Sequence, residues 1–410
     1  MKAATPIKDR FRSEAVRYSL RRTAEAVATH ENSPWRNERI IGRIAEIDGL
    51  RGLAILLVLV FHYIVSVSAP RHPVWALVTQ GGTLFWSGVD LFFVLSGFLI
   101  SGILLDSVHS KSYFKTFYLR RIHRIFPLYF AWLALFYAGV YLQMDRKFGV
   151  HIFESRAPLW LYPMFLQNNA PLLLNLELPL WMAMSWSLAV EEQFYFVLPT
   201  IIRFISKRAL GFVCGSVIIM SPIYRYFLVM RAPALNIGWP FATFSRLDGL
   251  AWGAALALFM RNETCWRWLR RSIHPLRIAA VSLFVVIATL TYRPQGEVRI
   301  ALYGFSIISA FYALLLVLAV CEPQSRLGVI LRSRLLQYVG TVSYAIYIFH
   351  QGIRGLVEWI LSPFHGVLNS MHVVVVTILA LGATVLLSQI SWLIVEKALI
   401  RRAHLRYTYS

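Results

Sequence analysis

The sequence predicts an all-α protein, a polytopic membrane bundle of about ten transmembrane helices with both termini cytoplasmic. Three observations predict it: the composition, a series of long apolar runs, and the placement of Lys and Arg. Of the 410 residues, 58% are hydrophobic and 15% are charged, whereas soluble domains are about half apolar and about a quarter charged. We therefore expect one membrane domain, although length alone would suggest two or three soluble ones.

Ten apolar runs account for the expected helices. Each is near the roughly 20 residues that a spanning helix needs, and the run at 277–292 is the shortest. In order, the runs are 50–67, 84–105, 121–142, 188–206, 209–229, 241–260, 277–292, 300–320, 339–360 and 372–396. Small residues at four-residue spacing predict close helix packing; they are Gly97 and Ser101 in one run, and Gly249, Gly253 and Ala257 in another.

The basic residues decide the number of spans. A net charge of +21 would suggest a nucleic-acid partner in a soluble protein, but cytoplasmic loops of membrane proteins are also rich in Lys and Arg. Ten spans place 31 of the 41 Lys and Arg residues inside, 7 outside, and three, Arg225, Arg246 and Arg354, within spans. An eleventh span at 158–169 would put basic segments outside, so ten is favoured and no nucleic acid is expected.

Three regions follow from this topology. Residues 1–45 lack the apolar core of a signal peptide and are predicted to be a basic cytoplasmic tail. Residues 46–398 form the transmembrane domain, and 399–410 a second short basic cytoplasmic tail. The one large outer loop is 143–187, and loops of this length are more often functional than plain connectors. Its run PLWLYPMFLQNN, at 158–169, is short and interrupted by proline, so we expect a re-entrant or interfacial element.

The stretch EIDGLRGLAILLVLVFH, residues 46–62, carries the first candidate site. Arg51 and His62 are eleven residues apart, so they share one helical face about 16 Å apart. A histidine within the membrane is costly and therefore a functional hypothesis. We interpret His62 as a general base that deprotonates an acceptor hydroxyl, with Asp90 orienting its ring. The alternatives are a packing histidine and an outer-boundary aspartate.

Further ionisable side chains are expected at a depth similar to that of His62. They are Asp90, Glu191, Glu192, Asp248 and His350, and their common depth favours one shared polar cavity. Adjacent carboxylates cannot share a helical face, so at most one of the two glutamates is expected to enter it, held by Tyr195 one turn later. A solvated helix N-terminus is the alternative for the glutamates, and a core position the alternative for His350.

The inner face carries a cluster of arginines. Arg51 joins Arg120, Arg121 and Arg124 of the run YLRRIHRIFP, and the planar guanidinium suits bidentate phosphate binding. Anchoring at the membrane boundary is the alternative, and it explains the deeper Arg124 least well. The three cysteines show neither metal nor disulfide spacing, so no metal site is expected.

Six motifs together resemble the acyltransferase-3 family of integral membrane O-acyltransferases. They occur in the family's order between residues 46 and 350: EIDGLRGLAILLVLVFH, GVDLFFVLSGFLIS, RRIHRIFP, SWSLAVEEQFYFVLP, FSRLDGLAWG and VSYAIYIFH. The resemblance implies an enzyme of the bacterial inner membrane. It would move an acyl group from cytoplasmic acyl-CoA to a hydroxyl of a carbohydrate or glycolipid. The acyl group is expected to be acetyl, because acetyl is the usual one in the family. The expected partners are membrane lipid and the proteins that assemble envelope polysaccharide.

The resemblance also implies roles for particular residues. His62 corresponds to the catalytic histidine, Asp90 to its acidic partner, and Glu191 to the acidic motif of the fourth span. Arg51 and the arginines at 120–124 correspond to the residues that hold the CoA phosphates. Some members carry a fused hydrolase-like domain outside the membrane. This chain ends about fourteen residues after its last apolar run, so we expect it to act alone or with a partner.

A second class of function competes with the enzyme. A transporter or flippase for a lipid-linked sugar would use the same intramembrane His, Asp and Glu residues to relay protons, and a receptor or scaffold comes third. The inner arginines and the histidine base favour the transferase. The sequence leaves the acceptor open among lipopolysaccharide, exopolysaccharide, lipo-oligosaccharide, peptidoglycan and small glycosylated metabolites.

Overall fold

The computed structural model describes residues 44–66, 82, 84–149, 151–231, 240–292, 299–364 and 371–409. The basic tail predicted at 1–45 therefore lies outside the described residues, except for its last two. Within these ranges all regular secondary structure is helical and there is no strand. The predicted all-α class is confirmed.

Ten long helices occur in the described residues, and each coincides with one predicted apolar run. Four of them, α18 with η7 (Ser362–Phe364) included, continue from or into π-helical or 3-10 turns, and the last has two parts joined by such a turn. They are α3 (Ala45–Val60) with η1 (Phe61–Val65), η2 (Phe85–Ser87) with α5 (Gly88–Ser107), α6 (Tyr113–Tyr141), α9 (Ser185–Phe204), α10 (Lys207–Arg231), α11 (Thr243–Met260), α13 (Ile273–Tyr292), η6 (Ile300–Gly304) with α15 (Phe305–Cys321), α18 (Ser343–Leu361), and α20 (His372–Ser391) with η9 (Trp392–Glu396) and α21 (Lys397–Arg406).

Seven of these helices in the described residues are long and apolar enough to cross a membrane. The other three, α9, α11 and α18, carry more polar and charged side chains and are the ones that build much of the site below. Large apolar side chains such as Phe212 on α10 and Ile278 on α13 are exposed, which water would penalise and lipid would not. The protein is a multi-pass membrane bundle, and the count of ten spans remains a prediction.

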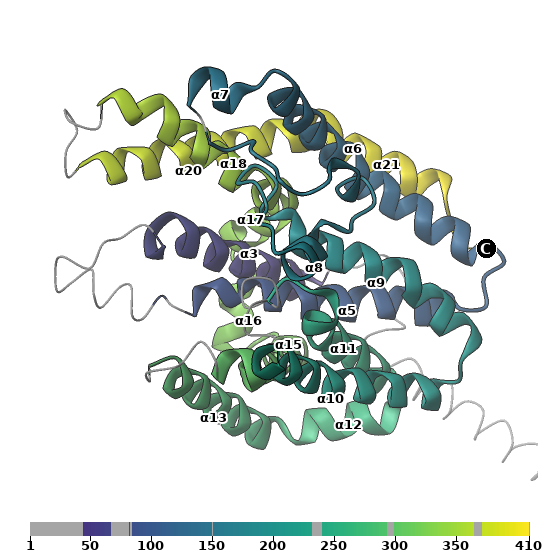
Figure 1. The fold of residues 1–410 in the computed structure, drawn as a ribbon. Helices are drawn as coiled ribbons and strands as arrows, with labels where there is room; N and C mark the ends of the chain where they lie inside the picture. Colours follow the sequence, from purple (N-terminus) through teal and green to yellow (C-terminus); the bar gives the residue numbers. More distant parts are fainter. Residues whose placement is uncertain are drawn as a thin grey trace, which may run out of the picture.

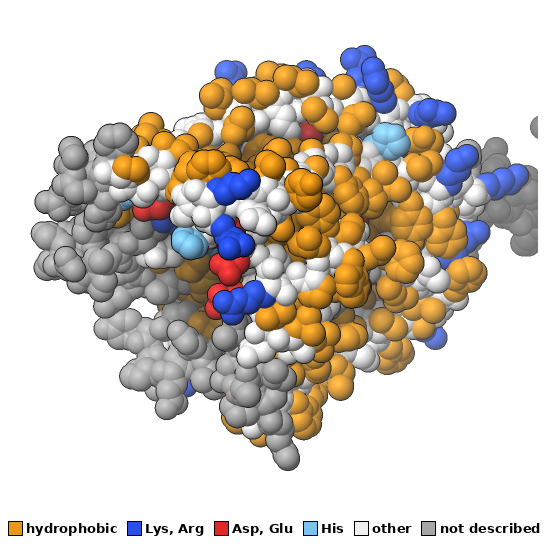
Figure 2. All heavy atoms as spheres, turned by 45° about the horizontal axis from the view of Figure 1, so that its top comes forward, with side chains coloured by type: hydrophobic (Ala, Val, Ile, Leu, Met, Phe, Trp, Pro, Cys, Tyr) orange, Lys and Arg blue, Asp and Glu red, His pale blue; other side chains and the backbone are white. Residues whose placement is uncertain are grey.

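One end of the bundle, which we call the C-terminal end, holds the last residues of the chain against the start of α6 (Figure 1). There Ser112 and Thr116 donate hydrogen bonds to the carbonyl of Thr408, at 2.8 and 3.0 Å. Figure 2 shows Lys and Arg side chains gathered toward this end, with hydrophobic side chains covering the middle of the same face. This distribution fits a cytoplasmic C-terminal end, which remains a prediction.

Short helices and turns connect the long helices. Among them are α12 (Glu263–Arg271) before α13, and α16 (Arg326–Leu331) and α17 (Arg334–Thr341) before α18. The predicted loop holds α7 (Met144–Phe148), η3 (Leu159–Leu161), η4 (Gln167–Asn169) and α8 (Ala170–Leu174), and η7 (Ser362–Phe364) follows α18. The loop is not a span but folds onto the bundle: Gln167 is fully buried and donates to Ser185 and to the hydroxyl of Tyr129. The run at 158–169 is therefore packed on the protein, as we expect of a re-entrant or interfacial element.

Small residues bring α5 and α11 into backbone contact, as their spacing predicted. A β-carbon on Gly97 would collide with the carbonyl of Leu250, and one on Gly253 would collide with that of Val94. Asp90, Val94 and Ser101, which share this face of α5 with Gly97, are buried. The helix pair therefore depends on two positions where only hydrogen fits.

We expect Gly97→Leu to destabilise the bundle strongly, because the backbone of α11 must move away to admit the side chain. Overpacking of this kind costs about 1–3 kcal/mol or more. Thermal unfolding of the purified protein in detergent measures the effect. Gly382→Leu on α20 is the control, since a β-carbon there meets no atom within 4 Å. Equal stability of the two variants would contradict the close packing.

Candidate active site

The DGLRG segment of α3 places Arg51 by close packing. A β-carbon on Gly49 would collide with the carbonyl of Leu331, and one on Gly52 with that of Leu336. These two glycines therefore let α16 and α17 press against the start of α3. Arg51 leaves this packed turn with Nη1 3.9 Å from the carboxylate of Asp48.

A cavity lies between α3, α5, α6, α9 and α18, and we call it the arginine cavity. Three guanidinium groups, from Arg51, Arg121 and Arg124, face a single carboxylate, that of Glu191. The cavity is therefore positively charged overall. Its full lining is Arg51, Val89, Phe92, Phe93, Leu95, Ser96, Arg121, Arg124, Ile125, Ser187, Leu188, Glu191, Tyr195, Ser343, Tyr344 and Tyr347.

Hydrogen bonds hold Glu191 in the cavity wall. Tyr195 donates to its Oε2 at 3.0 Å, and the hydroxyl of Ser96 lies 2.8 Å from that of Tyr195. Because the Tyr195 proton points to the carboxylate, Ser96 donates to Tyr195. The structure thus contains the expected contact of Tyr195 with Glu191. Glu192 is not among the lining residues, and its Oε1 is buried without a hydrogen-bond partner in the described part of the chain.

Tyr347 connects the arginine cavity to a second group of side chains. Its hydroxyl is 2.6 Å from that of Ser187, and both residues line the cavity. Its ring centroid also lies 5.7 Å from that of His350. A molecule held by the arginines of this cavity therefore also meets Tyr347 in the cavity wall, and behind Tyr347 lies a histidine.

His62 and His350 form a pair, with ring centroids 5.1 Å apart. In each ring Nδ1 contacts a backbone carbonyl, that of Val58 at 2.9 Å and that of Tyr347 at 2.8 Å. A carbonyl only accepts, so each neutral ring carries its proton on Nδ1 and a lone pair on Nε2. His350 is fully buried and its Nε2 has no partner among the described residues, whereas His62 is half-buried. The pair presents two basic nitrogens.

Local backbone geometry contributes to the position of His62. The α-helix of α3 widens at Phe61 into the π-helical turn η1, a feature found often at functional sites. Tyr63, in the same turn, donates to the carbonyl of His350 at 2.7 Å and lies 3.0 Å from the hydroxyl of Thr384. These contacts tie η1 to α18 and α20, and so hold the two histidines together.

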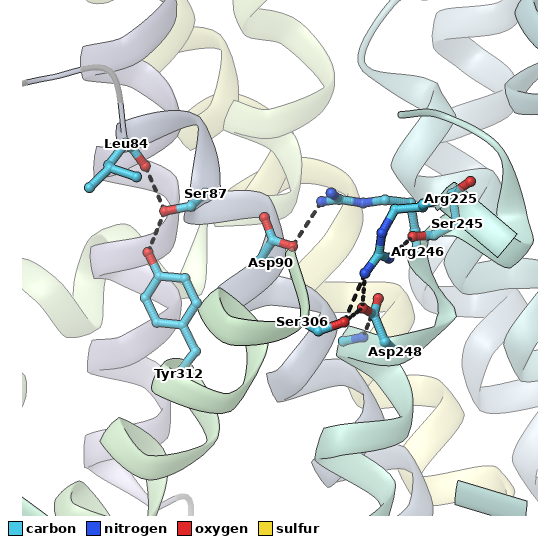
Figure 3. A network of polar contacts seen from close by, with 10 residues as sticks. Leu84, Ser87, Asp90, Arg225, Ser245, Arg246, Asp248, Ser306 and Tyr312 are labelled. Carbon is cyan, nitrogen blue, oxygen red and sulfur yellow. Dashed lines mark hydrogen bonds and ion pairs between the residues drawn. The ribbon is translucent and has the colours of Figure 1, made fainter. Parts of the chain in front are cut away.

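In place of the predicted orienting contact with His62, Asp90 forms an ion pair with Arg246 (Figure 3). Its Oδ1 accepts a hydrogen bond from Nη2 of Arg246 at 2.9 Å, and both side chains are at least 97% buried. No hydrogen bond joins Asp90 to His62 in the described residues, and Val58 holds the imidazole instead. The physical reason is that a buried carboxylate gains more from a full positive charge than from a neutral ring.

Asp248 belongs to a second buried pair in the same network (Figure 3). Its Oδ2 accepts from Arg225 at 2.9 Å and from Ser306 at 2.6 Å, and its Oδ1 accepts from the amide of Gly249 at 3.1 Å. Arg225 also donates to the carbonyl of Ser245. Both oxygens of this buried carboxylate are therefore engaged within the protein.

The polar residues predicted to share one cavity therefore fall into separate groups. The histidines pair with each other, the aspartates with arginines, and only Glu191 of the acids lines the arginine cavity. Sequence reasoning missed the roles of Arg225 and Arg246. The available signal was an arginine inside an apolar run, which requires a buried counter-ion.

Arg120 is the arginine of the inner cluster that the structure places elsewhere. Its Nε donates to the carbonyl of Tyr407 at 2.8 Å, and its guanidinium lies 5.2 Å from the ring centroid of Tyr409. It is absent from the lining of the arginine cavity. Arg120 thus fastens the C-terminal residues to α6, while Arg121 and Arg124 turn inward.

Comparison with known proteins decides the family of this chain. The model of the acyltransferase domain of the acyltransferase-3 family matches residues 44–390. The chain belongs to this acyltransferase family. The match covers all of the helices that build the arginine cavity and the histidine pair, so the two groups lie within the family domain.

Several relatives are named for an activity. The chain is 29% identical over 373 residues to the putative peptidoglycan O-acetyltransferase YrhL of Bacillus subtilis, covering 86% of this chain and 54% of the relative. It is 26% identical to the peptidoglycan O-acetyltransferase OatA of Listeria monocytogenes (89% and 57%) and 25% identical to the O-acetyltransferase OatA of Staphylococcus aureus (88% and 58%). The chain thus spans little more than half the length of these relatives. No solved structure matches it.

Proposed function

We propose that this acyltransferase moves an acetyl group from cytoplasmic acetyl-CoA to a hydroxyl of a cell-envelope carbohydrate, with the inner membrane as its location. The observation that carries the proposal is a cavity that joins two chemically different groups of side chains. Three guanidinium groups line the arginine cavity, and Tyr347 in the same lining leads to the histidine pair. Peptidoglycan, the acceptor in the names of two relatives, is the first candidate acceptor.

The arginine cavity suits the phosphates of CoA. Guanidinium groups bind phosphate oxygens with charge-assisted, often bidentate hydrogen bonds. Arg51, Arg121 and Arg124 supply three such groups, and Glu191, bonded to Tyr195, offsets part of the charge. With the phosphates held there, the flexible arm of CoA extends along the cavity, and its thioester comes to lie near Tyr347.

The histidine pair supplies the base. The acceptor hydroxyl gives its proton to Nε2 of His62 as its oxygen attacks the thioester carbonyl carbon. The carbon–sulfur bond then breaks, and the CoA sulfur takes the proton from the imidazolium. The products are an O-acetyl ester and free CoA. The carbonyl of Val58, which holds Nδ1–H, stabilises the imidazolium and takes the orienting role that was predicted for Asp90.

Binding of acetyl-CoA tests the cavity assignment. Loss of two charge-assisted contacts, each worth about 1.5–3 kcal/mol, predicts that Arg121→Ala with Arg124→Ala raises the Kd for acetyl-CoA at least about 100-fold. Arg120→Ala is the matched control from the same cluster and should change Kd by less than about threefold, because Arg120 contacts the C-terminal residues. Calorimetry on the purified protein measures both.

Two results would contradict the assignment. An unchanged Kd in the double variant would mean that Arg121 and Arg124 do not bind CoA and only anchor α6 at the membrane boundary. A larger effect from Arg120 than from the cavity arginines would place CoA on the surface of α6. The transfer itself is tested by labelled acetyl-CoA, which should label a purified peptidoglycan or other envelope-glycan fraction in the presence of the wild-type protein.

A further inference from the structure

Arg354 is a charged side chain that the steps above do not use. It follows His350 by four residues on α18, so the two lie on one helical face. Its Nε is buried without a hydrogen-bond partner, and it forms no ion pair with any residue the structure describes. The carboxylate one turn further on, that of Glu358, instead lies 3.1 Å from Nε2 of His372.

Arg354 stands next to the reactive end of the site. It lies one helical turn beyond His350 on the same face of α18, and the ring of His350 is paired with that of His62. Arg354 is on the far side of His350 from Tyr347, and so from the arginine cavity. The charge therefore stands where the acceptor, rather than CoA, would approach.

The neighbouring sequence offers this arginine little compensation. The segments that follow η1 and α18, residues 67–83 and 365–370, contain no Asp or Glu. An arginine in a membrane helix is costly without a counter-charge, and Asp90 and Asp248 already neutralise Arg246 and Arg225. Arg354 differs from those two arginines in having no ion pair within the described residues, because the nearest carboxylate, that of Glu358, contacts His372 and acts on Arg354 only from a distance.

We propose that Arg354 binds an oxyanion of the acceptor, a carboxylate or phosphate on or next to the sugar whose hydroxyl is acetylated. The inference rests on the proposed function and specifies its substrate class as acidic carbohydrate. Arg354 and His350 are one turn apart, about 6 Å along the helix, so anion and hydroxyl belong to the same or adjacent sugar rings. Two-point binding of this kind directs one hydroxyl to the base.

Transfer to matched acceptors tests the proposal. The acceptors are a uronic-acid oligosaccharide, its uronamide with the carboxylate neutralised, and a phosphorylated oligosaccharide. Arg354→Gln should lower kcat/KM at least about 30-fold for an acidic acceptor, mainly through KM, and lower it far less for the uronamide. Comparison of the two acidic acceptors tells carboxylate from phosphate. Arg354→Lys should recover part of the loss. Arg156→Gln, in the exposed part of the loop, is the control for loss of a positive charge.

Binding without acetyl-CoA separates this proposal from the proposed function. The wild-type protein should bind an acidic oligosaccharide more tightly than the uronamide in equilibrium dialysis, and Arg354→Gln should remove the difference. Such binding without acetyl transfer would refute the proposed function and keep the anion site. Acetyl transfer with equal losses for all acceptors, or with none, would refute the anion site alone.

A lipid headgroup is the other source of phosphate. The same assays in discs of neutral and of anionic lipid distinguish it from the acceptor. If Arg354→Gln changes transfer only according to the lipid, and never according to the acceptor's charge, the guanidinium binds lipid and the proposal is overturned.

Discussion

His62→Gln should lower the rate of acetyl transfer about 1,000-fold while leaving the affinity for acetyl-CoA nearly unchanged. The amide keeps the size and polarity of the side chain but cannot take the acceptor proton, and general base catalysis contributes about 10²–10⁴-fold. The arginines that hold CoA in the proposed mechanism line the arginine cavity, and His62 is not among the residues of that lining. The effect is therefore expected in kcat with saturating acetyl-CoA.

Two measurements on one preparation give this result. Transfer of labelled acetyl to an envelope glycan reports the chemical step, and calorimetry with acetyl-CoA reports binding. His404→Gln, an exposed histidine of α21 at the C-terminal end, is the matched control and should behave as wild type. If the His62 variant transfers acetyl at the wild-type rate, His62 is not the general base.

Asp90→Asn should destabilise the bundle by about 3–5 kcal/mol, because it leaves the buried charge of Arg246 without its counter-ion. The guanidinium of Arg246 is 97% buried and stacks 3.8 Å from the ring centroid of Phe305, so solvent cannot replace the lost carboxylate. Thermal unfolding in detergent and the yield of folded protein report the loss. Asp106→Asn is the control. Its partner Arg261 lies at 2.7 Å, but Asp106 is 57% exposed, so about 0–1 kcal/mol is expected.

A double variant separates structural from chemical roles of Asp90. Asp90→Asn together with Arg246→Met removes both charges, and replacing a whole buried pair by neutral side chains is often nearly neutral for stability. We expect the double variant to regain most of the stability and most of the transfer rate. A stable but inactive double variant would show that Asp90 takes part in catalysis after all.

Some of the site follows from local spacing and was predictable. The ten apolar runs coincide with the ten long helices of the described residues, because a spanning helix needs a long apolar stretch whatever its neighbours are. Tyr195 meets Glu191 since residues four apart share a helical face. The contact between α5 and α11 was also predictable, because small residues at four-residue spacing allow two helix backbones to approach.

Contacts between helices were decided by the tertiary structure alone. Asp90 pairs with Arg246, His62 lies beside His350, and Arg120 reaches the C-terminal residues. The sequence determined which polar side chains the membrane must accommodate and roughly how deep they lie. It did not determine which of them meet, because that depends on the rotation of each helix about its axis and on its depth beside its neighbours. A small rotation of the helix, or a shift of a few ångströms in its depth, decides whether a buried aspartate faces a histidine or an arginine.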